Sequence, residues 1–189
     1  WEKTNLNNSI IDKDFIKYRG LAAIYFSKYL SVNGSYGVLN IYGEPDKKFG
    51  DVALTYLRPE QFSATFSYEN NDARMVLYSP FIINSRIEIN NYRLKAAYNY
   101  LDAASFTGIY NYFNLSDKNE GNDLQIRLGK KFLVNGIFGY EFYFSDYSFI
   151  SAVYDSPQNY SSHCLWTEWI WNYSNYKIKA DARIGYSPS

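Results

Sequence analysis

Cysteine, histidine and methionine are almost absent from this chain of 189 residues, which holds one of each. The single cysteine, Cys164, excludes an internal disulfide, and one cysteine with one histidine excludes a Cys/His zinc cluster. No stretch reaches the ~18 consecutive apolar residues of a membrane-spanning helix. The formal net charge is zero, which removes the overall electrostatic argument for binding nucleic acid.

Aromatic residues are abundant instead. They make up 20% of the chain, and 21 of them are tyrosine. This content excludes a disordered chain, because disordered segments are poor in aromatic residues. No linker, low-complexity tract or internal repeat divides the sequence, and its length fits one domain. We therefore expect a single domain over residues 1–189.

Alternation of apolar and polar residues is the main structural signal. In 176–186, Tyr, Ile and Ala occupy every second position, with Lys, Asp, Arg and Gly between them. A period of two is typical of a strand with two different faces. The alternation is also clear in 62–68, 91–100 and 124–128, and weaker in 16–27, 34–43, 51–57, 104–114 and 136–145. The segment 162–172 fits either a strand or a helix face, and 71–78 fits a short helix.

Turn-forming residues separate these segments, among them Val32-Asn33-Gly34 and Arg58-Pro59-Glu60. Longer polar connections are expected over 43–50, 70–88, 115–122 and 146–161. The pattern predicts an all-β fold of about ten strands in antiparallel up-and-down order. The strands form either a complete barrel or a fragment of a larger one.

Two kinds of all-β protein give this pattern: a soluble antiparallel sheet, and a transmembrane β-barrel of the bacterial outer membrane. Segments such as 176–186 exceed the soluble mode of about five or six residues. Tyrosines near segment ends, such as Tyr92 and Tyr186, suit the aromatic girdle of a membrane barrel. Small apolar residues such as Ala96 and Ala182 would add little to a water-excluding core. These features favour the outer-membrane barrel, with the soluble sheet as the alternative.

Basic side chains lie between the apolar positions and would line the interior of such a barrel. This predicted lumen set is Arg19, Arg93, Lys95, Arg127, Lys177, Lys179 and Arg183. Few acids share these positions, chiefly Glu141 and Asp181, and others such as Asp123 are expected in loops. A basic interior favours anions. Alternatively, the cations pair with carboxylates inside a plugged barrel. The Asn, Ser and Thr residues between them suit a sugar chain or an ordinary solvated wall.

Catalysis is not predicted. Ser162 and His163 are adjacent, so on a strand they point to opposite faces and cannot act as nucleophile and base. We expect His163 to be an exposed residue at a loop end. The sequence has no Gly-rich phosphate loop, calcium loop or paired-carboxylate spacing. We therefore predict no enzymatic activity, cofactor or metal.

Two segments in expected connections, Tyr78-Ser79-Pro80 and 155–163, accompany the tyrosine-rich alternation of 91–114 and 176–186. Together they resemble the C-terminal outer-membrane barrels of bacterial polysaccharide exporters, which export cellulose, poly-N-acetylglucosamine or alginate. The periplasmic part of those exporters is built of TPR repeats. The resemblance implies passive export of a polymer through a barrel, with a periplasmic protein partner.

The sequence thus predicts an outer-membrane barrel or porin that conducts or exports a glycan or an anionic solute through a polar, basic lumen. The expected partners are membrane lipid, a polysaccharide or anionic solute, and a periplasmic protein, and no nucleic acid is expected. Two alternatives stay open. One is a structural or adhesion barrel whose long loops bind partners, and the other is a soluble antiparallel sheet that binds a ligand.

Overall fold

The computed structural model describes residues 2–8, 11–41, 45–77, 79, 81–82, 85–100, 103–133, 135–173 and 176–188. This part of the chain forms eleven β-strands and one short helix. The elements are β1 (Glu2–Asn8), β2 (Ile11–Tyr25), β3 (Leu30–Ile41), β4 (Lys47–Arg58), β5 (Phe62–Asp72), α1 (Ala73–Val76), β6 (Glu88–Tyr100), β7 (Ala104–Leu115), β8 (Glu120–Leu133), β9 (Gly136–Tyr147), β10 (Tyr160–Tyr173) and β11 (Tyr176–Tyr186).

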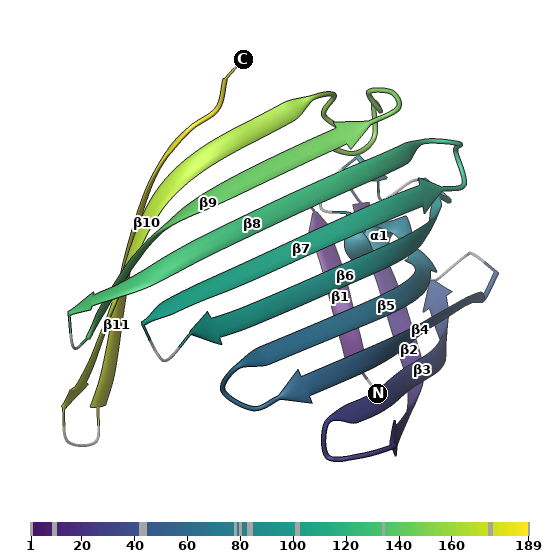
Figure 1. Ribbon diagram of the computed structural model, residues 1–189. Helices are drawn as coiled ribbons and strands as arrows, with labels where there is room; N and C mark the ends of the chain where they lie inside the picture. The colour runs from purple at the N-terminus through teal and green to yellow at the C-terminus, as the bar shows by residue number, and fades with distance from the viewer. Residues whose placement is uncertain are drawn as a thin grey trace.

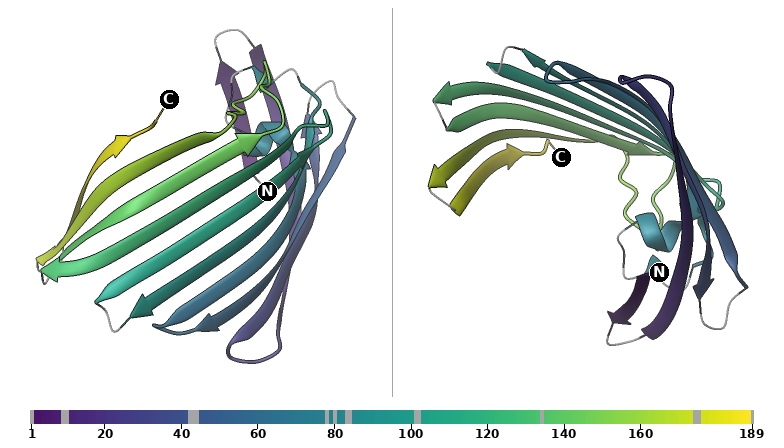
Figure 2. Two further views of the ribbon diagram at one scale, coloured as in Figure 1. Left: turned by 45° about the horizontal axis from the view of Figure 1, so that its top comes forward. Right: turned by 90° about the horizontal axis from the view of Figure 1, so that it is seen from below.

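All eleven strands belong to one antiparallel sheet whose spatial order is the order of the chain (Figure 1). The sheet is strongly curved, and α1 lies on its concave side (Figure 2). Within the described residues, β1 and β11 stand at opposite edges and the sheet does not close. The predicted all-β, antiparallel up-and-down fold is confirmed, with eleven strands where about ten were expected. No helix in the described part of the chain combines the length and hydropathy needed to cross a membrane.

The strands follow the alternation of the sequence. The segment 176–186 is β11 in full, and 162–172, which also fitted a helix, lies within β10. The short helix expected in 71–78 is the four-residue α1, and Tyr78 lies outside the described residues. β1 was not predicted, because its sequence, EKTNLNN, has no apolar alternation.

The turn expected at Val32-Asn33-Gly34 is wrong, since these residues lie inside β3 and pair with β2 and β4. The chain turns earlier, at 26–29. There the hydroxyl of Ser27 accepts hydrogen bonds from the backbone N–H groups of Tyr29 and Leu30. A serine bonded to nearby backbone groups in this way stabilises a turn without glycine.

The long connection expected at 115–122 is also wrong, because β7 and β8 are joined by a tight turn. The N–H of Leu115 donates to the carbonyl of Asn119 over 2.9 Å. Lys118 supplies the left-handed backbone conformation of the turn, with φ of 71°. The side chain of Asp117 accepts from the N–H of Asn119.

The strand register separates two faces of the sheet. Phe66 and Leu94 are cross-strand neighbours on the convex face, and Tyr110 continues the row on β7. One position along, Ser67 and Arg93 are neighbours on the concave face. Apolar side chains therefore gather on the convex face and polar ones on the concave face.

The convex face carries a broad band of exposed apolar side chains. Tyr92, Leu94 and Ile178 are 41%, 51% and 56% exposed. The chain exposes 12846 Å² in total. A soluble monomer of 22.1 kDa is expected to expose about 9300 Å². The apolar face of the sheet is therefore turned outward and does not form a packed core.

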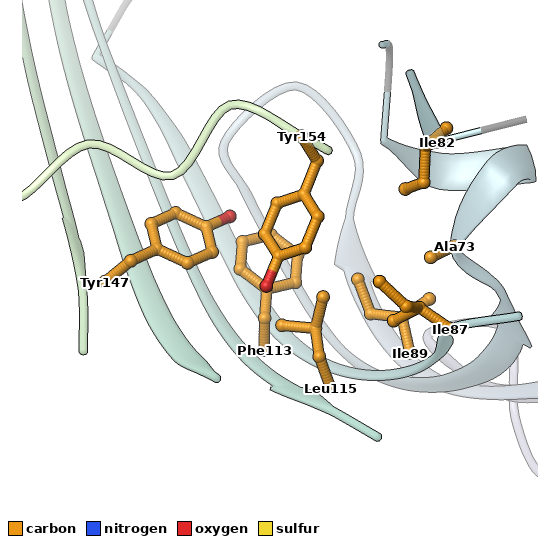
Figure 3. Packing of buried hydrophobic residues seen from close by; sticks show 8 residues of the cluster. All are labelled: Ala73, Ile82, Ile87, Ile89, Phe113, Leu115, Tyr147 and Tyr154. Atoms are coloured by element: carbon orange, nitrogen blue, oxygen red, sulfur yellow. The ribbon is translucent and has the colours of Figure 1, made fainter. Parts of the chain in front are cut away.

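Buried apolar residues gather at one end of the concave face, beside the long connections (Figure 3). We call this group the plug cluster: Ala73, Ile82, Ile87, Ile89, Phe113, Leu115, Tyr147 and Tyr154. The rings of Phe113 and Tyr147 stack with centroids 6.1 Å apart, and Ile89 has no exposed surface. The cluster holds α1 and the segment 148–157 against the sheet.

Charged groups anchor α1 beside this cluster. The carboxylate of Asp72 caps the helix by accepting from the N–H of Arg74 over 3.0 Å. It also accepts from the Arg74 guanidinium over 2.8 and 2.7 Å and from Lys47 Nζ over 2.5 Å. A cap of this kind contributes about 1 kcal/mol.

Candidate functional site

The concave face is the candidate site because it gathers the polar side chains of the sheet. All seven members of the predicted lumen set occupy concave-face positions: Arg19, Arg93, Lys95, Arg127, Lys177, Lys179 and Arg183. Lys177 is placed by its backbone register, and its side chain lies outside the described residues. Their role in binding stays a prediction.

Two of these cations form close ion pairs with carboxylates, one across β3 from β2 to β4 and one between the adjacent strands β10 and β11. Nη2 of Arg19 lies 2.6 Å from Oδ1 of Asp51, which also accepts from the Ser35 hydroxyl. Nζ of Lys179 lies 2.6 Å from Oε2 of Glu168. Because the two cations are largely exposed, each pair contributes at most about 1 kcal/mol. Their charges are nevertheless locally neutralised.

Arg127 is held on two sides. Its Nε lies 3.8 Å from Oε2 of Glu141, and its Cζ lies 3.8 Å from the centroid of the Trp166 ring. Trp166 is only 7% exposed and packs against Gly129 and Gly139, where an added Cβ would come within 3.0 and 2.5 Å of the indole. These two glycines make room for the indole, and the indole supports the guanidinium. Stacking of this kind limits the freedom of an arginine side chain.

Three other cations of the lumen set have no ion-pair partner among the described residues. Arg93, Lys95 and Arg183 form no ion pair with any described residue. The cross-strand neighbours of Arg93 are uncharged hydrogen-bonding residues, Ser67 and Asn111. These cations are therefore the described members of the lumen set that can meet an external anion without first breaking an ion pair.

Acids are more numerous on the concave face than the sequence predicted. The register adds four to Glu141 and Asp181, namely Asp51, Glu69, Asp123 and Glu168. Asp123 was expected in a loop, but β8 begins at Glu120 and includes it. The predicted separation of a basic interior from acidic loops is therefore only partial.

A hydrogen-bond network fixes the segment 148–157 at the plug end. The hydroxyl of Tyr154 donates to Oδ2 of Asp117 over 2.9 Å and accepts from Nδ2 of Asn119 over 2.8 Å. Nδ2 of Asn119 also donates to the carbonyl of Phe149, whose N–H donates to Oδ1 of Asn119. Burial is the main cause that raises the pKa of Tyr154 to about 12.

His163 lies within β10, so the expectation of an exposed residue at a loop end is wrong. It is on the convex face, with Nδ1 2.5 Å from the hydroxyl of Tyr140. Ser162 lies on the opposite face beside Tyr143, so the alternation separates serine from histidine. In the described part of the chain, no three His, Cys, Asp or Glu side chains are grouped to hold a metal ion.

Two structural residues of this face were missed in the sequence. Trp166 lies in the segment that fitted either a strand or a helix, so its face could not be assigned. The signal that points to it is a large aromatic residue at a polar-face position facing Gly139 on β9. Asn119 lies in a polar turn and gave no signal, because its partners come from a distant loop.

Comparison with known proteins gives structural likeness alone. No protein-family model matches the chain. No curated protein matches it. A solved structure described as "Bacterial polysaccharide outer membrane secretin" matches with a TM-score of 0.71 and 12% identity, over 93% of this chain and 64% of that one. The chain therefore shares the fold of that protein and spans 64% of its length.

Two structures of a porin were also matched. One, described as "KdgM porin in complex with disordered oligogalacturonate", has a TM-score of 0.41 and 16% identity over 92% of this chain and 84% of that one. The other, "KdgM porin", has a TM-score of 0.42 and 17% identity over 99% of this chain and 95% of that one. These scores are too low to carry an argument about this chain.

Proposed function

We propose that this chain forms all or part of an outer-membrane β-barrel whose concave face lines a path for a glycan or an anionic solute. The observation that carries the proposal is the two-faced sheet. Its apolar side is exposed, and its polar side is concave and basic in part. A bacterial outer-membrane location is part of the proposal.

The dimensions of the strands support a membrane setting. β3, β4, β7 and β9 each have 12 residues. At ~3.3 Å per residue and a tilt of about 45°, such a strand spans roughly 28 Å, which matches the ~25 Å apolar band of a membrane barrel. In water, the same convex face would be an exposed apolar patch of the kind that drives aggregation.

Placing this sheet in lipid requires its edges to be paired. Unpaired backbone N–H and C=O groups each cost several kcal/mol in hydrocarbon, so only closed sheets span membranes. In the proposed barrel, the edges at β1 and β11 pair with each other or with further strands. The edges must be paired whether the chain forms a complete barrel or part of one.

The cargo is proposed from the unpaired part of the concave wall. Arg93 and Lys95 form no ion pair with a described residue, and their cross-strand neighbours Ser67, Asn111 and Thr65 offer hydroxyl and amide groups. Cations attract carboxylate or phosphate groups, and the neutral groups can hydrogen-bond sugar hydroxyls. An acidic glycan, or a smaller anion, can contact both the cations and the neutral hydrogen-bonding groups. The polysaccharide-exporter type, with a periplasmic protein partner, is the specific form of this proposal, and no enzymatic activity is proposed.

Conductance in planar bilayers tests the proposal. The reconstituted chain should carry current and prefer anions. A charge about 10 Å from a passing ion in water contributes about 0.4 kcal/mol, so Arg93→Gln with Lys95→Gln should lower the anion-to-cation permeability ratio several-fold at low salt. The matched control is Lys48→Gln with Lys118→Gln, which removes the same charge away from the concave face and should leave the ratio unchanged. Absence of current from inserted protein would remove the transport function.

A second candidate, a non-transporting barrel with a closed interior, is favoured by the ion pairs of Arg19, Arg127 and Lys179 and by the plug cluster. It predicts insertion into bilayers without current or solute-driven swelling. The third, a soluble sheet, predicts that the purified chain stays monomeric without detergent. The three outcomes are mutually exclusive.

A further inference from the structure

The two margins of the convex apolar band differ in charge. At the end of the sheet where β2 connects to β3, β4 to β5 and β8 to β9, three exposed cations border the band, a group that we call the turn margin: Lys28, Arg58 and Lys130. Glu60 is the one described acid in these turns.

Each cation of the turn margin stands beside an aromatic ring. Nζ of Lys28 lies 4.8 Å from the centroid of the Tyr29 ring. Arg58 is the cross-strand partner of Phe62. Lys130 is in the same way the cross-strand partner of Phe138, which is 48% exposed.

The opposite, loop margin has a different chemistry. It carries a row of asparagines on the same convex face: Asn70, Asn90, Asn114 and Asn122. Tyrosine hydroxyls donate to two of them, with Tyr68 at 2.8 Å from Asn90 and Tyr110 at 2.6 Å from Asn122. Asp146 ends this row on β9. The acids Glu88 and Glu120 and the cation Lys48 lie on the same face at this margin. Amides and a surplus of acids thus border one side of the band, and a surplus of cations borders the other.

We propose that the turn margin binds the phosphate groups of anionic phospholipid headgroups. The inference rests on the membrane placement in the proposed function, but not on transport. Aromatic rings settle at the interface between hydrocarbon and headgroups, and lysine and arginine beside them reach outward to the phosphates. On the side of the loop margin, the exposed cations Lys48, Arg86 and Lys118 are outnumbered by the acids Asp46, Glu88, Glu120 and Asp146. The preference therefore belongs to one membrane surface.

The spacing of the cations favours a headgroup layer over a single bound anion. Arg58 lies on β4 and Lys130 on β8, four strands apart, which corresponds to roughly 19 Å across the sheet. One phosphate cannot contact both residues. A continuous anionic surface can contact all three cations at once.

The test measures lipid preference in the full chain. The protein is reconstituted in phosphatidylcholine vesicles, and the relative association of spin-labelled phosphatidylglycerol and phosphatidylcholine is measured. The triple variant Lys28→Gln, Arg58→Gln, Lys130→Gln is compared with wild type. The matched control, Lys48→Gln, Arg86→Gln, Lys118→Gln, removes three exposed cations on the side of the loop margin.

Wild type and control should prefer phosphatidylglycerol at low salt, and the triple variant should lose the preference. Each lost cation is expected to lower the association of phosphatidylglycerol relative to phosphatidylcholine about fivefold at the lipid site that this cation contacts. An unchanged preference in the triple variant, or an equal loss in the control, would overturn the proposal. Competition by inorganic phosphate would overturn it as well, because it would indicate a discrete anion site. A protein that conducts current without lipid preference refutes this inference alone, whereas failure to insert refutes the proposed function too.

Discussion

Removal of the Asn119 side chain should release the segment 148–157 from the concave face. The Asn119 carboxamide has no exposed surface and makes three hydrogen bonds, two with Phe149 and one with Tyr154. At about 1 kcal/mol each, their loss in Asn119→Ala should destabilise the attached segment by about 2–3 kcal/mol. Tyr154→Phe removes one hydroxyl with two partners and should cost about 1–2 kcal/mol.

Limited proteolysis measures this effect directly, because cleavage within the segment requires local opening. If opening is in fast equilibrium, 2–3 kcal/mol corresponds to cleavage roughly 30- to 150-fold faster in Asn119→Ala. Tyr154→Phe should fall between this variant and wild type. Ala152→Ser, an exposed change in the same segment, is the control and should cleave at the wild-type rate.

Two results would refute this reasoning. One is cleavage of Asn119→Ala at the wild-type rate, which would mean that the network does not hold the segment. The other is a larger effect in Tyr154→Phe than in Asn119→Ala, since the tyrosine loses fewer bonds. If the segment also narrows a conducting lumen, single-channel current should rise in the same order as the cleavage rate.

Three further predictions use other parts of the structure. Tyr154 has its pKa raised from 10.0 to about 12, so its stabilising effect is complete below pH 10 and is lost as the pH rises towards 12. Cleavage should accelerate over that range in wild type and less in Tyr154→Phe. Leu94→Arg, at the centre of the convex band, should cost about 2–4 kcal/mol of folding free energy in bilayers, whereas Asn99→Arg on the concave face should cost little; equal costs would argue against lipid contact. Gly139→Ala should cost about 1–3 kcal/mol in denaturant titrations because its Cβ would meet both the backbone carbonyl of Leu128 and the indole of Trp166, and Gly20→Ala, whose nearest contact would be 3.8 Å away, should lie within about 0.5 kcal/mol of wild type.

The fold was predictable where alternation is strict. In β11 each apolar residue is two positions from the next, so all of them lie on one face. A shift of the strand by one residue would move every one of them to the other face. β1 was missed because a polar strand has no such pattern, and only its pairing with β2 reveals it. The turn at 115–122 was misjudged because its compactness depends on the backbone of Lys118 and on bonds made by Asn119.

The site was predictable as a face but not as a set of contacts. The alternation of the sequence places Arg93, Lys95 and Arg127 on the polar face, and the strand register agrees. Alternation cannot show that Arg127 rests on Trp166 while Arg93 forms no ion pair in the described part of the chain, because the neighbours across a strand pair come from distant positions. Charge neutralisation on the wall is therefore a property of the register, and the composition of the chain does not reveal it.

This distinction decides which cations can govern ion preference. A paired cation such as Lys179 presents a dipole to the lumen, and the field of a dipole falls off faster than that of a single charge. Arg93 and Lys95 lie two positions apart on one face of β6, about 7 Å along the strand. In water their mutual repulsion is about 0.6 kcal/mol, and an anion between them relieves it. The adjacent pair on β6 should therefore dominate anion selectivity, and neutralising Lys179 should change the selectivity much less than neutralising either residue of that pair.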